Sequence, residues 1–238
     1  MSFNFAHVWA TMAPLSKGVA MVLLVMAISF IGVTIERLIA FAKSAKESRF
    51  FAGQAGKLLE ERRLEEIVML AKKHEASALA RLFGPVIVRF VQAYEGMTEG
   101  ALSPVELARN EAGRRLEAIA EEVRRGMNVI ATVGSIAPFV GLLGTVLGII
   151  GAFQGIGAAG SSGIGPIMAG ISEALVETAF GLLVAIPAVI AFNYLNARVS
   201  AIDTALARSS GELMDELEDH FGRVSVGDGA QIVDQHAA

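Results

Sequence analysis

The chain has 238 residues, of which 53% are apolar and only 18% are charged, and its mean hydropathy is +0.54. Soluble domains carry about 25% charged residues, so this composition indicates a membrane protein. The sequence contains no cysteine, which excludes disulfides, thiolate metal sites and cysteine nucleophiles, and its net charge of −4 argues against nucleic-acid binding.

Two stretches of the sequence are almost free of charge and predict the membrane-spanning segments. Residues 18–35 carry no charged side chain, and residues 126–197 carry only Glu173 and Glu177. A transmembrane helix needs about 20 apolar residues. The predicted fold class is therefore an all-α integral membrane protein with three transmembrane helices and long cytoplasmic helical extensions. The expected spans are 18–39, 126–154 and 166–197, with a short glycine-rich periplasmic turn at 155–165.

The distribution of positive charge predicts the orientation of the chain. Of the 20 lysine and arginine residues, 16 lie between Arg37 and Arg125. Under the positive-inside rule this places residues 1–17 in the periplasm, residues 40–125 in the cytoplasm, and the C-terminal segment in the cytoplasm. A cleaved signal peptide ending at residues 40–42 is the alternative. It is disfavoured because the apolar run is long for one and charged residues separate it from that site.

The cytoplasmic segment has the apolar periodicity of amphipathic helices. Residues 57–74 and 77–94 each place apolar side chains at helical spacing, and Pro85 interrupts the second stretch. These apolar stripes are typical of helices that pack together in a bundle. Docking of another cytoplasmic protein is the alternative use, and the pattern does not choose between the two.

A strong helix-start signal precedes the second span. Ser103 suits the N-cap, Pro104 suits the first helical position, and Glu106 is placed to bond back to the cap. With no proline before Pro138, the pattern predicts one long helix that rises from the cytoplasm into the second span. After the third span we expect a cytoplasmic helix at 198–221 and a disordered tail at 222–238.

The two membrane carboxyls are the first candidates for function. An ionisable group inside a span is costly to place there, so it indicates a functional site. Glu173 and Glu177 are one helical turn apart, and desolvation favours the neutral form of each. Such a carboxyl suits proton movement. A permanently protonated, structural carboxyl is the alternative for both residues.

Other residues of the second and third spans have expected local roles. The hydroxyls of Thr145 and Thr178 can bridge water in a channel, although bonding back to their own helix is the commoner use. Pro138 and Pro187 are expected to kink their helices. The four histidines show no ligand spacing, so we expect no metal site and no cofactor. Four glycines predict a face for close helix packing: Gly141, Gly144, Gly148 and Gly151.

The two later spans resemble those of a known family. The run from Gly141 to Ile149, Gly-Leu-Leu-Gly-Thr-Val-Leu-Gly-Ile, resembles the second span of the MotA/TolQ/ExbB proton channel family. The run from Gly170 to Leu175, Gly-Ile-Ser-Glu-Ala-Leu, followed by Thr178-Ala179 and Ala185-Ile186-Pro187-Ala188, resembles its third span. The resemblance extends over about residues 10–220. Three spans favour the ExbB branch, with TolQ a close second, over the four-span MotA branch.

The resemblance implies a function that the residues alone do not. It implies a bacterial inner-membrane proton channel subunit, not an enzyme, that assembles as a pentameric ring and converts proton motive force into work on the cell envelope. The implied partners are an ExbD/TolR-like single-span protein with a membrane aspartate, a TonB/TolA-like protein, and membrane lipids. Glu173, Thr145 and Thr178 then correspond to the proton pathway, and protons are the transported ion.

This sequence departs from the family motif at one position and leaves alternatives open. Glu177 stands where the motif has alanine or another small residue, so it either enlarges the proton site or faces a neighbouring subunit. Besides ExbB-like outer-membrane uptake, TolQ-like envelope maintenance and gliding-motility stators use the same architecture. A membrane scaffold without ion flow is the alternative from another class.

Overall fold

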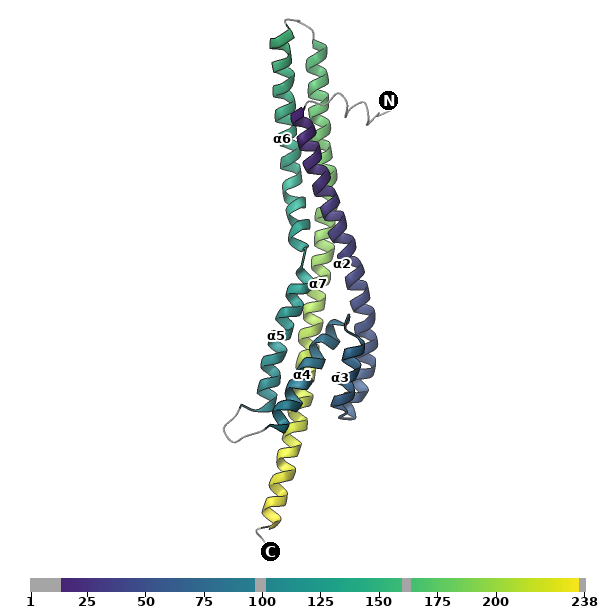
Figure 1. Cartoon of the computed structure of the whole chain (residues 1–238), viewed down its shortest axis with the longest axis vertical. Coiled ribbons are helices and arrows are strands. Elements are labelled where there is room, and N and C mark those ends of the chain that lie inside the picture. Colours follow the sequence, from purple (N-terminus) through teal and green to yellow (C-terminus); the bar gives the residue numbers. More distant parts are fainter. Residues whose placement is uncertain (1–13, 97–101, 160–163, 236–238) are drawn as a thin grey trace. The chain divides into compact units, whose positions relative to one another are not determined.

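The structure is a computed structural model that describes residues 14–96, 102–159 and 164–235, and within these ranges its regular elements are all α-helices (Figure 1). Side chains are described for fewer residues than the backbone near 155–169 and beyond 219. The chain divides into a membrane unit, residues 14–38 and 125–197, and a second unit, residues 39–124 and 198 onward. The helices are α2 (Pro14–Glu60), α3 (Leu64–Lys73), α4 (Ala78–Glu95), α5 (Pro104–Arg124), α6 (Met127–Ala159) and α7 (Ile164–Gln235).

Three segments are long and apolar enough to cross a membrane, as the charge pattern predicts. They lie within Pro14–Glu60, Pro104–Gln154 and Gly170–Asp219, and no more than 28% of the most apolar window of any of them is buried within the chain. The apolar side chains that remain exposed suit contact with lipid or with other protein chains. The protein is therefore all-helical in its described residues, with three helices of membrane-spanning character.

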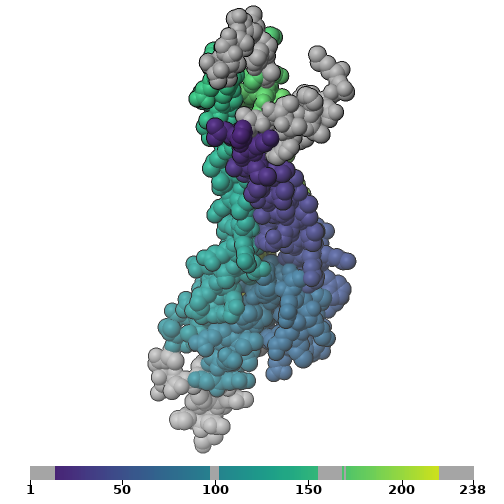
Figure 2. Space-filling view, turned by 45° about the horizontal axis from the view of Figure 1, so that its top comes forward, coloured from purple at the N-terminus to yellow at the C-terminus, as the bar shows by residue number. Residues whose placement is uncertain are grey.

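In the membrane unit the start of α2 lies along α6, and α6 lies along the first part of α7 (Figures 1 and 2). Each helix contributes an inner stripe at helical spacing, because residues three or four apart share one face. The buried apolar side chains include Val19, Leu23 and Phe30 of α2, Ile130, Val133 and Ala137 of α6, and Ala174, Val184, Ala185 and Ala188 of α7.

In the second unit the short helices α3, α4 and α5 form an apolar core with the remaining parts of α2 and α7. Among its fully buried side chains are Phe51, Ile67, Leu82, Ile87, Phe90, Leu213 and Leu217. The predicted N-cap at Ser103 is confirmed, since its hydroxyl accepts a 3.1 Å hydrogen bond from the backbone N–H of Glu106. Ser77 caps α4 in the same way, accepting from the N–H of Ala80 at 3.0 Å. Pro85 lies inside α4 without ending it.

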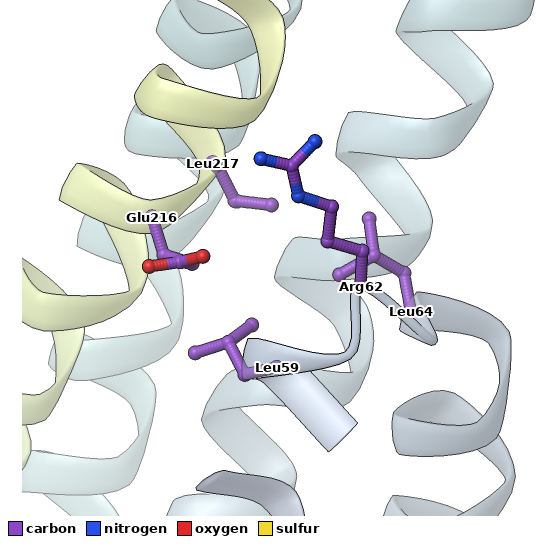
Figure 3. Close-up of a pocket in the computed structure, with 5 residues that line it drawn as sticks. All are labelled: Leu59, Arg62, Leu64, Glu216 and Leu217. Atoms are coloured by element: carbon purple, nitrogen blue, oxygen red, sulfur yellow. The ribbon is translucent and has the colours of Figure 1, made fainter. Parts of the chain in front are cut away.

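The apolar pattern at 57–74 belongs to two helices rather than one. α2 ends at Glu60, the chain turns at 61–63 with Arg62 at φ 60°, and α3 begins at Leu64. A residue in the left-handed conformation ends a right-handed helix, so the apolar stretch that was predicted as one helix divides at Arg62. Figure 3 shows the small pocket beside this turn, about 10 Å³ in volume, which is room for about one water. It is lined by Leu59, Arg62, Leu64, Glu216 and Leu217.

The predicted long helix from residue 104 into the second span is also interrupted. α5 ends at Arg124 and α6 begins at Met127, with Gly126 between them at φ +79°. Glycine adopts this conformation without the steric cost that other residues bear. A Cβ on Gly126 would lie 2.9 Å from Cγ1 of Val33, so the start of α6 also passes close to α2.

Two boundaries near the ends of α7 differ from those predicted. α6 continues to Ala159 and α7 begins at Ile164, so the predicted turn at 155–165 is largely helical; residues 160–163 lie outside the described residues. The predicted tail at 222–238 is helical to Gln235. Each glycine costs a helix about 1 kcal/mol but keeps its backbone hydrogen bond. Proline would remove such a hydrogen bond, and no proline follows Pro187 in the sequence.

A glycine-lined interface with buried hydroxyls and a carboxyl

The interface between α6 and α7 is built on glycine, which lets the two backbones approach closely. A Cβ on Gly141 would lie 3.0 Å from the carbonyl oxygen of Glu177, and one on Gly148 would lie 2.9 Å from Cβ of Ala174. A Cβ on Gly181 of α7 would lie 2.7 Å from the carbonyl oxygen of Ala137. No side chain fits at these points, so the small residues are a geometric requirement of the interface.

Three of the four predicted packing glycines lie in this interface and the fourth does not. Gly141, Gly144 and Gly148 contact α7, whereas a Cβ on Gly151 would meet nothing within 4 Å. Ala152 takes the next contact instead, since a Cβ on Gly170 would lie 2.6 Å from its Cβ. The sequence pattern identified the face on α6, but it missed the glycines at 134, 170 and 181. The available signal was spacing: Gly134 precedes Gly141 by seven residues on α6, and Gly170 and Gly181 lie eleven residues apart on α7.

Thr145 and Thr178 meet across the interface through their hydroxyl groups, which are within hydrogen-bonding distance of each other. Both hydroxyls also lie within hydrogen-bonding distance of one acceptor, the carbonyl oxygen of Gly141, at 3.2 Å from Thr145 and 2.9 Å from Thr178. Each hydroxyl has a single proton to donate, so two of these three contacts are hydrogen bonds at any one time. Thr145 thus bonds back to its own helix, as its residue type favours. Thr178 instead bonds to the neighbouring helix, which the close approach at Gly141 makes possible.

Glu177 is buried inside the unit, with 2% of its surface exposed. Its side chain occupies the space that a Cβ on Gly144 would fill, since that atom would lie 1.9 Å from Oε2. A residue that faces a neighbouring subunit would be exposed in the single chain. Of the two alternatives left open for Glu177, its burial contradicts the one in which it faces a neighbouring subunit, and its carboxyl belongs to the same interface as the threonine pair.

A third polar residue, Ser16 of α2, was not predicted as part of this region. It is 1% exposed, and its hydroxyl lies close enough to the Glu177 carboxyl to interact with it. Neither group forms a hydrogen bond of ordinary geometry with any described residue. The available signal was spacing, because Ser16, Val19 and Leu23 follow the same buried stripe along α2.

Glu173 lies one helical turn before Glu177 on α7 and is partly exposed in the single chain. The two carboxyls are near enough to interact electrostatically. The partial exposure of Glu173 gives its carboxyl access to whatever covers this part of α7. The structure thus places one membrane carboxyl at the surface of the unit and the other inside it.

The two prolines of the spans lie within continuous helices, Pro138 in α6 and Pro187 in α7. The kinks expected at these positions stay a prediction. Among the residues that the structure describes, no group of three or more histidine, cysteine or acidic side chains is placed to hold a metal ion.

The arrangement is chemically suited to holding a proton in an apolar region. Carboxyl groups in a medium of low polarity favour the neutral acid, and hydroxyl groups both donate and accept hydrogen bonds. α6 carries no charged residue from Met127 to Ala159 that would hold a carboxylate as a fixed ion pair. The region therefore joins a partly exposed carboxyl, a buried carboxyl and three hydroxyls within one small bundle.

Comparison with known proteins finds relatives named ExbB and TolQ. Biopolymer transport protein ExbB of Xanthomonas campestris pv. campestris is 41% identical over 133 residues, which are 55% of this chain and 51% of that protein. Tol-Pal system protein TolQ of Haemophilus influenzae is 37% identical over 135 residues, 57% of this chain and 54% of that protein. Biopolymer transport protein ExbB of Neisseria gonorrhoeae is 54% identical over 71 residues, 30% of this chain and 32% of that protein.

The matched segment spans about half the length of the first two relatives, as their 51% and 54% coverage shows. A model of the MotA/TolQ/ExbB proton channel family matches residues 89–208, about half of the chain, and so includes α5, α6 and most of α7. The motifs at 141–149 and 170–188, which carried the resemblance, lie inside that match. The chain belongs to the MotA/TolQ/ExbB proton channel family.

Proposed function

We propose that this protein is the proton-conducting subunit of an ExbB-like complex in the bacterial inner membrane, which converts proton motive force into mechanical work on the cell envelope. Its family membership and its three apolar helices indicate a multi-pass inner-membrane protein. The N-terminus faces the periplasm, and residues 40–125 and the C-terminal part of α7 lie in the cytoplasm, in keeping with the positive charge between Arg37 and Arg125.

The observation that supports the proposal is a partly exposed carboxyl, Glu173, on α7 five residues before Thr178 of the threonine pair. Glu173 is partly exposed in a span whose only other charged residue is Glu177. Thr145 and Thr178 hold their hydroxyls together one to two turns away, on the carbonyl oxygen of Gly141. A carboxyl that becomes neutral when dry and ionises when wetted carries a proton between two aqueous sides, and hydroxyls order water along such a path.

The proposed complex includes further chains, because much of the apolar surface of the unit is uncovered. Side chains such as Leu142, Val146 and Leu175 are at least 49% exposed in the single chain. A pentameric ring of this subunit around an ExbD/TolR-like single-span partner would cover such surfaces and would present a partner aspartate to Glu173. A TonB/TolA-like protein would receive the work. Lipid covers the remaining apolar surface.

The ExbB-like role is favoured over the TolQ-like one by the relatives themselves. The Xanthomonas ExbB is 41% identical over 133 residues and the Haemophilus TolQ is 37% identical over 135 residues. The TolQ-like role in envelope maintenance is the second candidate, supported by that second relative. Both roles require the same proton step at Glu173, so the test of the proton step serves either.

The test is proton flux through the complex purified from its native membranes by a tag on this chain. The complex is placed in vesicles with a pH-sensitive dye inside, and an imposed membrane potential drives proton entry. Glu173→Gln preserves the shape of the side chain and removes the exchangeable proton, so the flux should fall to the background of protein-free vesicles. Glu212→Gln is the matched control on the same helix. Glu212 is exposed and pairs only with Arg208 at 3.0 Å, so flux should be unchanged.

A scaffold without ion flow predicts a different result. In that case the wild-type complex would admit no more protons than empty vesicles, and Glu173→Gln would support growth under envelope stress or nutrient limitation as well as the wild type does. Wild-type flux in the Glu173→Gln complex would also contradict the proposal, because the other acidic residue of the third span, Glu177, is buried.

A further inference from the structure

Glu177 is a buried acid that forms no hydrogen bond of ordinary geometry with the described residues, and its surroundings are shaped for it. Both carboxyl oxygens are inaccessible and form no hydrogen bond with the described residues. The side chain lies over Gly144, where any Cβ would come within 1.9 Å of Oε2 and 3.0 Å of Cβ and Cδ. The glycine therefore provides the volume that the carboxyl occupies. No described cation pairs with the Glu177 carboxyl in this buried position. The position therefore suits the neutral carboxylic acid, because an unpaired carboxylate there would be strongly destabilised.

Ser16 gives this acid a partner in either protonation state. Its hydroxyl is buried, lies near the Glu177 carboxyl and is itself without an ordinary hydrogen bond. A hydroxyl accepts a hydrogen bond from a carboxylic acid and donates one to a carboxylate. A small rotation of either side chain thus satisfies the pair before and after the proton leaves. A purely structural acid needs only one of these two arrangements.

The charged groups around Glu177 come from two of the three helices. On α7, Glu173 lies one turn away and is close enough to interact with it. On α2, Lys17 is next to Ser16 in the sequence and is partly exposed. On α6 no residue from Met127 to Ala159 is charged. Of these neighbours, Glu173 is close enough for its negative charge to disfavour a second one on Glu177, so the two carboxyls interact electrostatically.

We propose that Glu177 is a second proton-binding site of this chain, which exchanges its proton with Glu173 during each cycle. In the exchange the O–H bond on the Glu177 carboxyl breaks, an O–H bond forms on the Glu173 carboxylate, and the negative charge passes the other way without any electron transfer. Glu173, which is partly exposed, then releases this proton outside the unit, takes up another, and passes it back to the Glu177 carboxylate. This inference rests on the proposed proton-conducting function.

The pair of carboxyls can be followed by infrared difference spectroscopy of the purified complex, which needs no reagent to reach the buried side chain. Carboxylic acids and carboxylates absorb at separate frequencies, and exposed carboxyls have lost their protons above about pH 6. The wild type should then show two acid bands that disappear as pH rises. Glu177→Gln should remove one band. Glu173→Gln should remove the other and change the pH at which the remaining band disappears.

Proton flux is measured on the same samples. Glu177→Gln and Glu177→Ala should each lower the flux by about tenfold or more, the scale of effect that a positioned proton-transfer group commonly has. Glu212→Gln again serves as the control. Because Glu177→Gln retains the size of the side chain and Glu177→Ala vacates the space at Gly144, one of the two variants remains informative if the other does not assemble.

The outcomes separate this inference from the proposed function. Wild-type flux in both Glu177 variants overturns the inference, whether the Glu177 band is absent or persists unchanged at every pH as that of a permanently neutral acid. Loss of flux in Glu173→Gln alone would leave the proposed function standing. Unchanged flux in Glu173→Gln would overturn the proposed function, regardless of the behaviour of Glu177.

Discussion

The hydroxyl of Thr178 donates its hydrogen bond to the carbonyl oxygen of Gly141, 2.9 Å away on the neighbouring helix, and not to a carbonyl of its own helix. Hydrogen bonds between membrane helices contribute on the order of 0.6 kcal/mol each on average, so this bond adds little to stability. Its value lies in position, because it fixes a hydroxyl group beside Thr145. Under the proposed function, this position suits a role in conduction more than one in holding the helices together.

Replacing Thr178 by valine tests that role. Thr178→Val retains the branched shape and removes the hydroxyl, so we expect a clear loss of proton flux with a shift of melting temperature too small to separate from the wild type. Thr34→Val is the matched control, since the Thr34 hydroxyl bonds only to the carbonyl of Phe30 in its own helix, at 2.7 Å. Equal flux in the two valine variants would show that the Thr178 hydroxyl has no part in conduction.

Alanine substitution of one glycine inside the interface between α6 and α7 and of one outside it tests the described packing. In Gly181→Ala the new Cβ would lie 2.7 Å from the carbonyl oxygen of Ala137, a backbone atom that cannot rotate away. We expect a loss of about 1–3 kcal/mol, the usual cost of overpacking. Gly151→Ala meets nothing within 4 Å and gains helix propensity. Thermal unfolding in detergent checks both, and a Gly181→Ala protein as stable as Gly151→Ala would contradict the described packing.

The break between α5 and α6 gives a further prediction. Gly126→Ala places a side chain at φ +79°, and its Cβ lies 2.9 Å from Cγ1 of Val33. The left-handed conformation alone costs about 1–2 kcal/mol. Gly113→Ala, in the middle of α5 with open space around it, should instead be neutral or stabilising by up to about 1 kcal/mol. The difference in melting temperature between the two variants measures the cost, and no difference would indicate that α5 and α6 form one continuous helix.

The ion pairs of Glu111 predict a pH dependence in the second unit. Burial raises the pKa of the Glu111 carboxyl, but hydrogen bonds from Arg114 and Arg115 outweigh it, so the pKa is lowered overall. A lowered pKa stabilises the folded state above the unfolded value of about 4.5, and this contribution is lost as the pH falls through the folded value.

Glu111→Gln should therefore destabilise the protein at pH 7, and the difference from wild type should vanish in acid. Both arginines are exposed, and i,i+3 and i,i+4 pairs contribute about 0.2–0.5 kcal/mol each, so the effect is below about 1 kcal/mol. Melting curves of the two proteins across the acidic range supply the measurement. A difference that grows as the pH falls would contradict the assignment.

The three spans could be predicted because charge is nearly absent from them, and the N-cap at Ser103 because its side chain acts locally. The breaks at Arg62 and Gly126 could not, since many glycines and arginines occur inside helices and only the surrounding packing decides which adopt positive φ. Local sequence therefore predicts the presence of each helix well, but it predicts poorly the residue at which a helix ends.

The candidate site was predictable in its residue types and less so in its geometry. Glu173, Thr145 and Thr178 followed from the motifs, but the orientation of Glu177 depended on how α6 crosses α7. Gly144 and Gly151 have the same residue type on the same predicted face, yet only Gly144 meets the other helix. The partner of Glu177 on α2, Ser16, lies 161 positions away in the chain, and no local pattern connects residues so distant.

The glycine contacts between α6 and α7 restrict which motions can accompany proton transfer. At Gly141 and Gly181 backbone meets backbone, so neither helix can slide along the other without a collision between atoms that have no rotamers to change. The two helices must then move as one rigid body. Any stroke of the proposed motor has to arise at a surface other than this one, either where α2 lies along the pair or where this chain meets a neighbouring chain.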